Sequence, residues 1–205
     1  MRAWRTDATL RASGRLGTTA LAAVVLWIAP CAAAMQNTGE RSPQVSSGQF
    51  SNSPNGLACD GLVAQATAGF QAQTFSLFGF DIPAGATVTG ILVRVRANDG
   101  NDSGRNLQVS VSWNGGRSFS GYIPTQNFQP GAPLRDFYVG GSRALWGHAW
   151  THADLGDRNF RLRLRAEMPG GSEPINLDCP PVTVFYAFPT PRPRAAEKTP
   201  DDEVR

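Results

Sequence analysis

Three segments of the chain alternate between apolar and polar residues, with Leu92 as an apolar exception on the polar side of the first. They span residues 88–96, 107–113 and 159–167. Successive side chains of a β-strand point to opposite faces, so this period of two predicts three strands that are each buried on one face. The expected inward residues are Ile91, Val93, Val95, Leu107, Val109, Val111, Trp113, Phe160, Leu162, Leu164 and Ala166. The outward positions carry Arg94, Arg96, Arg161, Arg163 and Arg165.

Shorter strands are expected between segments rich in glycine, proline, asparagine and aspartate, which favour turns. These candidates span residues 46–51, 62–67, 73–80, 118–123, 134–139 and 181–188. Thr151 and Asp154 have the spacing of a capping box, so one helical turn is expected there. About eight or nine short strands without sustained helical periodicity predict an all-β protein. The expected architecture is a two-sheet antiparallel β-sandwich with a jelly-roll-like arrangement.

The first 34 residues have a different pattern from the rest of the chain. An apolar run from 21 to 29 and the small residues 32–34 follow four arginines, Arg2, Arg5, Arg11 and Arg15. This is the pattern of a secretory signal peptide cleaved after Ala34. The apolar run is shorter than the roughly 20 residues that span a bilayer, so no membrane insertion is expected after cleavage. The alternative is a lipoprotein signal acylated at Cys31, although Pro30 stands where Gly or Ala is usual.

The chain divides into four parts by composition. We expect a signal peptide (1–34), a polar linker (35–45), the β-sandwich domain (46–189) and a disordered, Pro-rich and charged tail (190–205). The expected location is secreted, periplasmic or at the cell surface of a bacterium.

Charge gives no indication of a nucleic-acid partner once the signal peptide is set aside. The full chain has 19 Lys and Arg against 16 Asp and Glu. Residues 1–34 hold four Arg and one Asp, so 15 basic and 15 acidic side chains remain. The mature chain is therefore near neutral, and neither nucleic acid nor an anionic membrane is expected as a partner.

Cysteine usage predicts a disulfide. After cleavage, Cys59 and Cys179 remain as an even pair in an oxidising compartment. A bond between them closes a loop of about 120 residues, for which the chain-entropy argument gives about 4–5 kcal/mol. A metal site is the weaker alternative, because two lone cysteines without a second pair do not make a zinc site.

Four sequence blocks resemble a recurrent, mostly uncharacterised β-sandwich module of secreted and surface proteins of bacteria and phage-associated sequences. The blocks are 50–67 (FSNSPNGLACDGLVAQAT), 79–95 (GFDIPAGATVTGILVRV), 138–160 (YVGGSRALWGHAWTHADLGDRNF) and 178–186 (DCPPVTVFY). They occur in order over nearly all of residues 50–188. The resemblance implies a structural or adhesive accessory module without a catalytic residue set. It also brings the first and last blocks together, which supports the Cys59–Cys179 disulfide.

A loop with two tryptophans and two histidines is the first candidate binding site. Exposed indole rings on the rim of a sandwich could stack on sugar rings, with carboxylates accepting hydrogen bonds from hydroxyl groups. The candidate residues are Trp146, His148, Trp150, His152, Asp154 and Asp157. In the alternative, both tryptophans close the open end of the sandwich and Asp154 only caps a helical turn. The two histidines could also bind a metal if the segment is helical and a third ligand is present.

Two further surfaces are candidates. The loop at Asp99, Asn101 and Asp102 offers oxygen ligands that suit calcium, although the same residue types are common in hairpin loops. The outward arginines would form an anion patch for sulfated or phosphorylated glycans if their strands were neighbours in one sheet. In the alternative, these arginines form an ordinary solvated face. Apart from calcium, no cofactor is expected.

No recognisable catalytic motif is present, so an enzyme is not expected. The chain lacks a G-x-S-x-G elbow, an H-E-x-x-H pair and a phosphate loop. The expected function is an exported, non-catalytic module for binding or adhesion at the cell surface, with carbohydrate as the candidate ligand. The alternative is a self-assembling structural subunit of a surface layer, fibre or particle. A secreted hydrolase is the lesser alternative, because carboxylate separation in space is not fixed by sequence.

Overall fold

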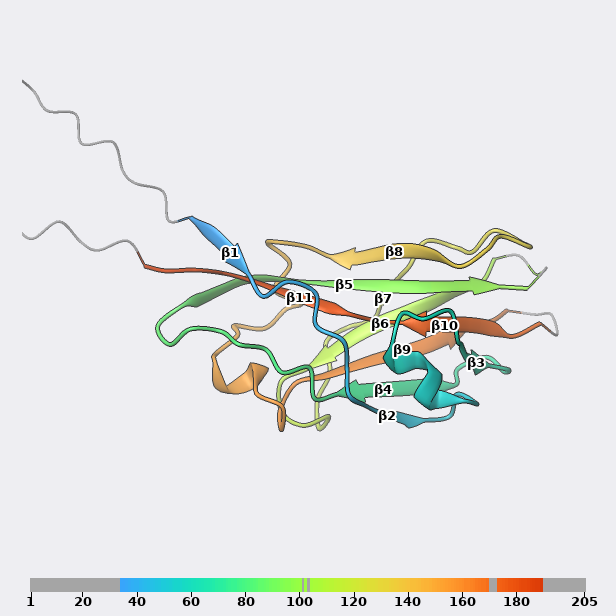
Figure 1. The fold of residues 1–205 in the computed structure, drawn as a ribbon, viewed down its shortest axis with the longest axis horizontal. Coiled ribbons are helices and arrows are strands. Elements are labelled where there is room, and N and C mark those ends of the chain that lie inside the picture. The colour runs from blue at the N-terminus through green and yellow to red at the C-terminus, as the bar shows by residue number, and fades with distance from the viewer. Residues whose placement is uncertain (1–33, 101, 103, 170–172, 190–205) are drawn as a thin grey trace, which may run out of the picture. The chain divides into compact units, whose positions relative to one another are not determined.

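The computed structural model describes residues 34–100, 102, 104–169 and 173–189. The expected signal peptide before Ala34, the expected tail and Asn101 lie outside the described residues. Within the described ranges, two antiparallel sheets face each other, and the expected β-sandwich is confirmed (Figure 1). Its eleven strands exceed the expected number because short edge strands such as β1 and β7 are too brief to show alternation. No helix in these ranges is long and apolar enough to cross a membrane.

The first sheet has six strands arranged around β5 (Thr87–Asp99). The others are β1 (Met35–Asn37), β3 (Ala64–Ala66), β8 (Arg135–Gly140), β10 (Ile175–Cys179) and β11 (Val182–Ala187). β8 pairs with residues 92–97 of β5, while β11 pairs with 87–93 and β10 with 96–99. β8 overlaps both of the other ranges, so β10 and β11 share the opposite edge of β5.

β10 and β11 lie end to end along the same side of β5, and the strand pairing is interrupted between them at Pro180 and Pro181. Proline has no N–H to donate to the ladder, so strand pairing breaks there. The carbonyl of Pro181 still accepts a hydrogen bond from the Arg94 N–H at 3.0 Å. The two short strands β3 and β1 pair with the outer edges of β10 and β11.

The second sheet has five strands in the order β2-β4-β9-β6-β7. They are β2 (Val45–Gly48), β4 (Ala72–Ser76), β9 (Arg161–Glu167), β6 (Asn106–Ser112) and β7 (Ile123–Pro124). The chain crosses between sheets from β4 to β5 to β6 and again from β8 to β9 to β10, as expected for a jelly-roll-like arrangement. Two short 3-10 turns, η1 (Ser53–Leu57) and η2 (Ala153–Leu155), lie in the connections.

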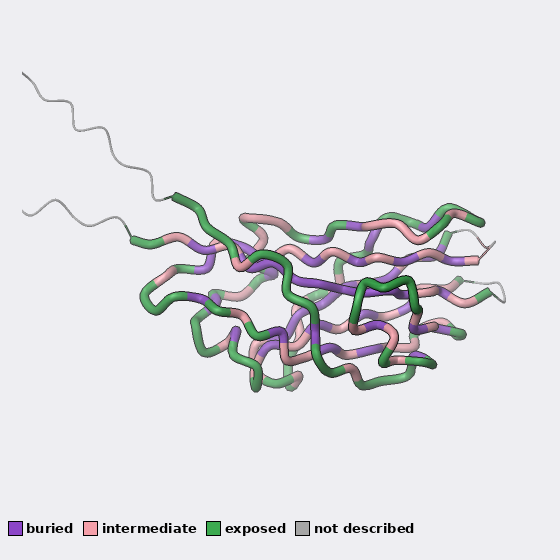
Figure 2. Tube along the Cα trace, in the orientation of Figure 1, coloured by how far each residue is buried: buried purple, intermediate pink, exposed green. Residues whose placement is uncertain are grey.

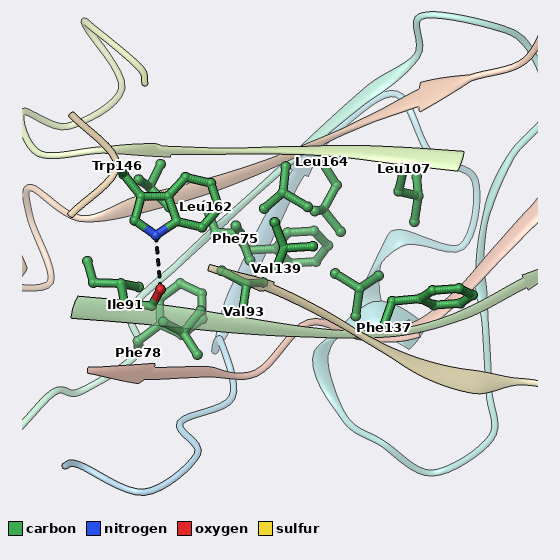
Figure 3. Packing of buried hydrophobic residues seen from close by; sticks show 14 of the residues in the cluster. Phe75, Phe78, Ile91, Val93, Leu107, Phe137, Val139, Trp146, Leu162 and Leu164 are labelled. Atoms are coloured by element: carbon green, nitrogen blue, oxygen red, sulfur yellow. Dashed lines mark hydrogen bonds between the residues drawn. The ribbon is translucent and has the colours of Figure 1, made fainter. Parts of the chain in front are cut away.

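The core consists of the side chains that alternation placed inward. Buried and less buried residues alternate along β5 and β9 (Figure 2), and aliphatic side chains from both sheets meet between them (Figure 3). All of the expected inward residues are buried except Trp113, which lies just after the end of β6 and is only partly buried.

The segment expected to be a linker contributes to the first sheet. β1 pairs with β11, and Arg41 forms an isolated bridge with Val182. Glu40 pairs with Arg94 of β5. The linker interpretation of 35–45 is therefore wrong at these positions, because backbone hydrogen bonding adds an edge strand without requiring an apolar pattern.

The predicted Cys59–Cys179 disulfide is confirmed, with the two Cα atoms 5.1 Å apart. The neighbouring Asp178 supports the same junction. Its Oδ1 accepts hydrogen bonds from the N–H groups of Asp60 at 3.1 Å and Gly61 at 2.9 Å. The turn before β3 is thus attached to the end of β10 by covalent and polar bonds.

Candidate functional site

The two tryptophans of the 141–150 loop close one end of the sandwich. Trp146 and Trp150 are each only 8% exposed. The Trp146 Nε1–H donates to the carbonyl of Ile91 at 3.0 Å (Figure 3), and the Trp150 Nε1–H donates to the carbonyl of Leu145 at 2.8 Å. The expectation that they form an exposed sugar-stacking rim is therefore wrong. A buried indole with its N–H satisfied is a packing element.

Glycine allows Trp146 to lie against β5. Gly140 has φ of 89°, and a Cβ there would contact the carbonyl of Ile91 and lie 3.0 Å from the indole of Trp146. Any side chain at this position would push the loop off the strand. Trp146 itself has φ of 57°, a conformation that the surrounding packing must hold in place.

The two histidines do not form a metal site. His148 stacks on Trp113, with ring centroids 4.3 Å apart and an angle of 9° between planes, whereas His152 is exposed. The segment from 148 to 152 is not helical, so the expected i, i+4 spacing does not place both rings on one face. Over the described part of the chain, no group of three or more His, Cys, Asp or Glu residues could hold a metal ion.

Asp154 forms the predicted capping box with Thr151. The Thr151 N–H donates to Asp154 Oδ2 at 2.8 Å, and the Asp154 N–H donates to Thr151 Oγ1 at 3.3 Å. The same Oδ2 lies 3.1 Å from His148 Nε2. Burial raises the pKa of Asp154, but the bonds from Thr151 and the contact with His148 outweigh burial and hold the pKa below its ordinary value.

A polar depression of about 440 Å³ lies beside this capping box. Its walls come from the loop after β6 and from the segment around η2. The residues that line it are Trp113, Asn114, Gly115, Arg117, Asp154, Arg158 and Asn159. The N–H of Gly115 donates to the carbonyl of Asn159 at 2.8 Å and joins the two segments.

Trp113 is the aromatic wall of this depression, and alternation alone assigned it to the core. Its indole is partly exposed, with His148 stacked on it and Trp150 edge-on at 6.3 Å between ring centroids. These contacts fix the orientation of the indole ring. Its place at the strand end, before the Asn114-Gly115-Gly116 turn, was the available sequence signal.

Asp157, the remaining carboxylate of the expected site, does not line the depression. Its Oδ1 accepts a hydrogen bond from the Gly79 N–H at 3.0 Å. This bond ties the segment after η2 to the chain between β4 and β5, so Asp157 has a structural contact. Of the six residues expected at the tryptophan loop, Asp154 alone lines the depression.

The five arginines expected in one patch lie on different sheets. Arg94 and Arg96 belong to β5, whereas Arg161, Arg163 and Arg165 belong to β9. The single patch is therefore wrong, because the outward faces of the two sheets of a sandwich point in opposite directions.

Both arginines of β5 form ion pairs with carboxylates. Arg94 Nε lies 2.8 Å from Glu40 Oε1, and Arg94 Nη1 lies 2.9 Å from Asp136 Oδ1. Burial alone lowers the pKa of Arg94. The hydrogen bonds and charges of Glu40 and Asp136 raise it by more, so the pKa of Arg94 lies above its ordinary value. Arg96 Nε lies 3.0 Å from Asp178 Oδ2. These pairs connect β5 to Glu40, to β8 and to β10, and so stabilise the sheet.

The arginines of β9 stack on aromatic rings. Arg163 lies over Phe119, with its Cζ 3.4 Å from the ring centroid, and Arg165 lies over Tyr122 at 4.2 Å. The chain between β6 and β7 supplies both rings, so it lies across the outer face of the second sheet. Stacking leaves the edge of a guanidinium available for hydrogen bonding.

The two described aspartates of the expected calcium loop lie beside a buried arginine. Asp102 pairs with the guanidinium of Arg105, which is fully buried, and Asp99 is only 1% exposed. Burial raises the pKa of Asp99, and the nearby charge of Arg105 only partly offsets this. Arg105 thus places a positive charge next to both aspartates.

Comparison with known proteins gives only distant similarity. No protein-family model matches the chain, and no curated protein matches it. One similar structure is a truncated AlyQ with CBM32 and alginate lyase domains, at 12% identity and a TM-score of 0.38, covering 78% of this chain and 35% of that one. Another is the CBM22-1-GH10 part of Clostridium thermocellum endo-1,4-beta-D-xylanase 10B complexed with xylohexaose, at 10% identity and a TM-score of 0.38. That match covers 73% of this chain and 28% of the xylanase chain.

The chain thus spans well under two thirds of the length of both proteins. At this level of similarity, neither protein carries an argument about ligand or activity here.

Proposed function

We propose that this protein is an exported, non-catalytic β-sandwich module that binds a carbohydrate in the depression at Trp113. The observation that carries the proposal is a partly exposed, pre-oriented indole beside amide, carboxylate and guanidinium groups. A sugar ring presents C–H groups to an aromatic face and hydroxyl groups to polar side chains around its edge. Asn114, Asn159 and Asp154 offer such partners next to Trp113.

The carboxylate of the depression supports a binding role over catalysis. Among the residues that line it, Asp154 alone is acidic. Its pKa is held below the ordinary value, whereas a general acid at neutral pH requires a raised pKa. Hydrolysis of a glycosidic bond usually needs a second carboxylate across the bond.

Export is supported by the disulfide and by the sequence that precedes the described residues. The Cys59–Cys179 disulfide belongs to an oxidising compartment. A basic, then apolar, then small-residue pattern precedes the described residues and has the form of a secretory signal.

The test compares tryptophans that differ in exposure. The purified protein is screened on a glycan microarray, and binding is quantified by isothermal titration calorimetry for the protein and for Trp113→Ala, Trp113→Phe and Trp146→Phe. We expect Trp113→Ala to abolish measurable binding and Trp113→Phe to weaken it about tenfold, because the smaller ring buries less of the sugar's apolar surface. Trp146→Phe, in the closed end of the sandwich, should retain the affinity.

Thermal melting of each variant separates loss of fold from loss of binding. Trp113→Phe keeps a ring against His148 and is the informative variant if Trp113→Ala is poorly folded. Full affinity in Trp113→Phe and Trp113→Ala would overturn the site. No glycan binding by the folded protein, together with self-assembly in light scattering, would overturn the function in favour of a structural subunit.

A further inference from the structure

We infer that the glycan is acidic, a polymer that carries carboxylate or sulfate groups. This inference rests on the proposed function and names the ligand class of the same depression. It is carried by Arg117 and Arg158, two exposed arginines on the wall of the depression. A guanidinium binds a carboxylate or sulfate through two parallel N–H bonds, which a neutral hydroxyl group cannot reproduce.

Within the described part of the chain, neither arginine forms an ion pair with a carboxylate. Ion pairs between described residues engage Arg94, Arg96, Arg105 and Arg165, whereas Arg117 and Arg158 take part in none of them. Asp154, the nearest candidate in the depression, is already bonded to Thr151 and lies against His148. Two positive charges without a carboxylate partner among the described residues therefore line the depression.

Positive charge continues from the depression along the outer face of β9. The Cγ of Arg161 lies 3.9 Å from the position of a Cβ built on Gly116, in the turn that carries Arg117. Arg163 and Arg165 follow at every second residue, so their Cα atoms are about 7 Å apart along the strand. This row begins beside Arg117 and suits a ligand with repeated negative charges better than a single charged sugar.

The surrounding contacts hold this row in place. Arg163 is stacked on Phe119, and Arg165 lies over Tyr122 with its guanidinium bonded to Gln108 Oε1. Arg161 Nη1 donates to the carbonyl of Asp157 at 2.7 Å. Glu167 is the acidic group beside the row, with its Oε2 4.0 Å from Arg165 Nη2. Side chains fixed in this way lose little entropy when an anionic polymer binds.

The test uses polymers that differ only in charge. Polygalacturonate is compared with its methyl ester, and dextran sulfate with dextran, by affinity electrophoresis and calorimetry. We expect binding to at least one acidic member and none to its neutral counterpart. Arg117→Gln and Arg158→Gln should each weaken that binding about tenfold, because each removes a charge-assisted hydrogen bond. Arg143→Gln, an exposed arginine outside the depression, is the matched control and should stay within about twofold.

Binding of polygalacturonate would identify the anionic group as a carboxylate, and binding of dextran sulfate would identify it as a sulfate. Equal binding of charged and neutral counterparts, lost in Trp113→Ala and weakened in Trp113→Phe, would overturn the acidic class and leave the carbohydrate function standing. No binding to any glycan would overturn both. Single-stranded DNA is the control polymer that carries phosphate groups. If DNA binds as tightly as the acidic glycan, and Arg117→Gln and Arg158→Gln weaken both equally, a saccharide ligand is overturned. Binding should also weaken as ionic strength rises from 50 to 300 mM, and salt-independent binding would contradict the charge-based contact.

Discussion

Single residues of the same type have different roles in this protein. Trp146 and Trp150 are buried with their N–H groups bonded to backbone carbonyls, whereas Trp113 is partly exposed. The difference depends on loop conformation, since Gly140 lets the 141–150 loop approach β5 closely. A residue type in a loop therefore identifies candidates for a site but does not choose among them.

Among single residues, Asp154 makes the free energy of unfolding depend on pH. Its pKa is lower in the folded protein, so its stabilising contribution is fully present above the unfolded value, near 3.8. The contribution is lost as pH falls through the lowered folded value. We expect Asp154→Asn to lower the free energy of unfolding by about 1 kcal/mol at pH 7, because the cap to Thr151 is weakened. Urea unfolding between pH 7 and pH 2 should show a smaller acid-induced loss in the variant, and parallel curves for both proteins would contradict this.

At the scale of elements, β5 is the strand on which the first sheet is built. It pairs with three strands, and its buried side chains supply much of the core. Most of these residues were predicted by alternation. Alternation did not show that the loop after β8 passes directly over the strand at Gly90, where a Cβ would overlap the backbone of residues 141–143.

Gly90 should tolerate no side chain. We expect Gly90→Ala to lower the free energy of unfolding by about 3 kcal/mol, because the loop carrying Trp146 would have to move off β5. Gly121→Ala is the matched control, since a Cβ there has no atom within 4 Å, and its effect should stay within about 0.5 kcal/mol. Chemical denaturation of both variants measures the difference. Equal stability of the two would refute the close approach at Gly90.

At the scale of the whole molecule, the disulfide joins the segment before β3 to the end of β10. The two cysteines are separated by 120 positions, so the bond restricts most of the unfolded sandwich. We expect reduction, or the double variant Cys59→Ser/Cys179→Ser, to cost about 4 kcal/mol of unfolding free energy. Melting curves with and without dithiothreitol measure this. The double variant should be insensitive to the reductant, and a protein whose melting temperature is unchanged by reduction would contradict a structural role for the bond.

The sequence alone determined the fold class and most of the core. Alternation fixes which face of β5, β6 and β9 is apolar, and an apolar face in water must be covered by a second sheet. The Thr151–Asp154 capping box and the Cys59–Cys179 pair also followed from local spacing and from an even count of cysteines. These features are decided by neighbours in the chain or by simple counting, so no tertiary information is needed.

Only the tertiary structure decided which side chains lie together at the depression that we propose as the binding site. Strand order separates Arg94 and Arg96 from the arginines of β9, and it places the turn after β6 beside η2, about 40 residues later in the chain. Burial removes Trp146 and Trp150 from the surface and leaves Trp113 at the depression. Such placements depend on which segments pack together, and packing is set by long-range contacts that a local pattern of polar and apolar residues does not encode.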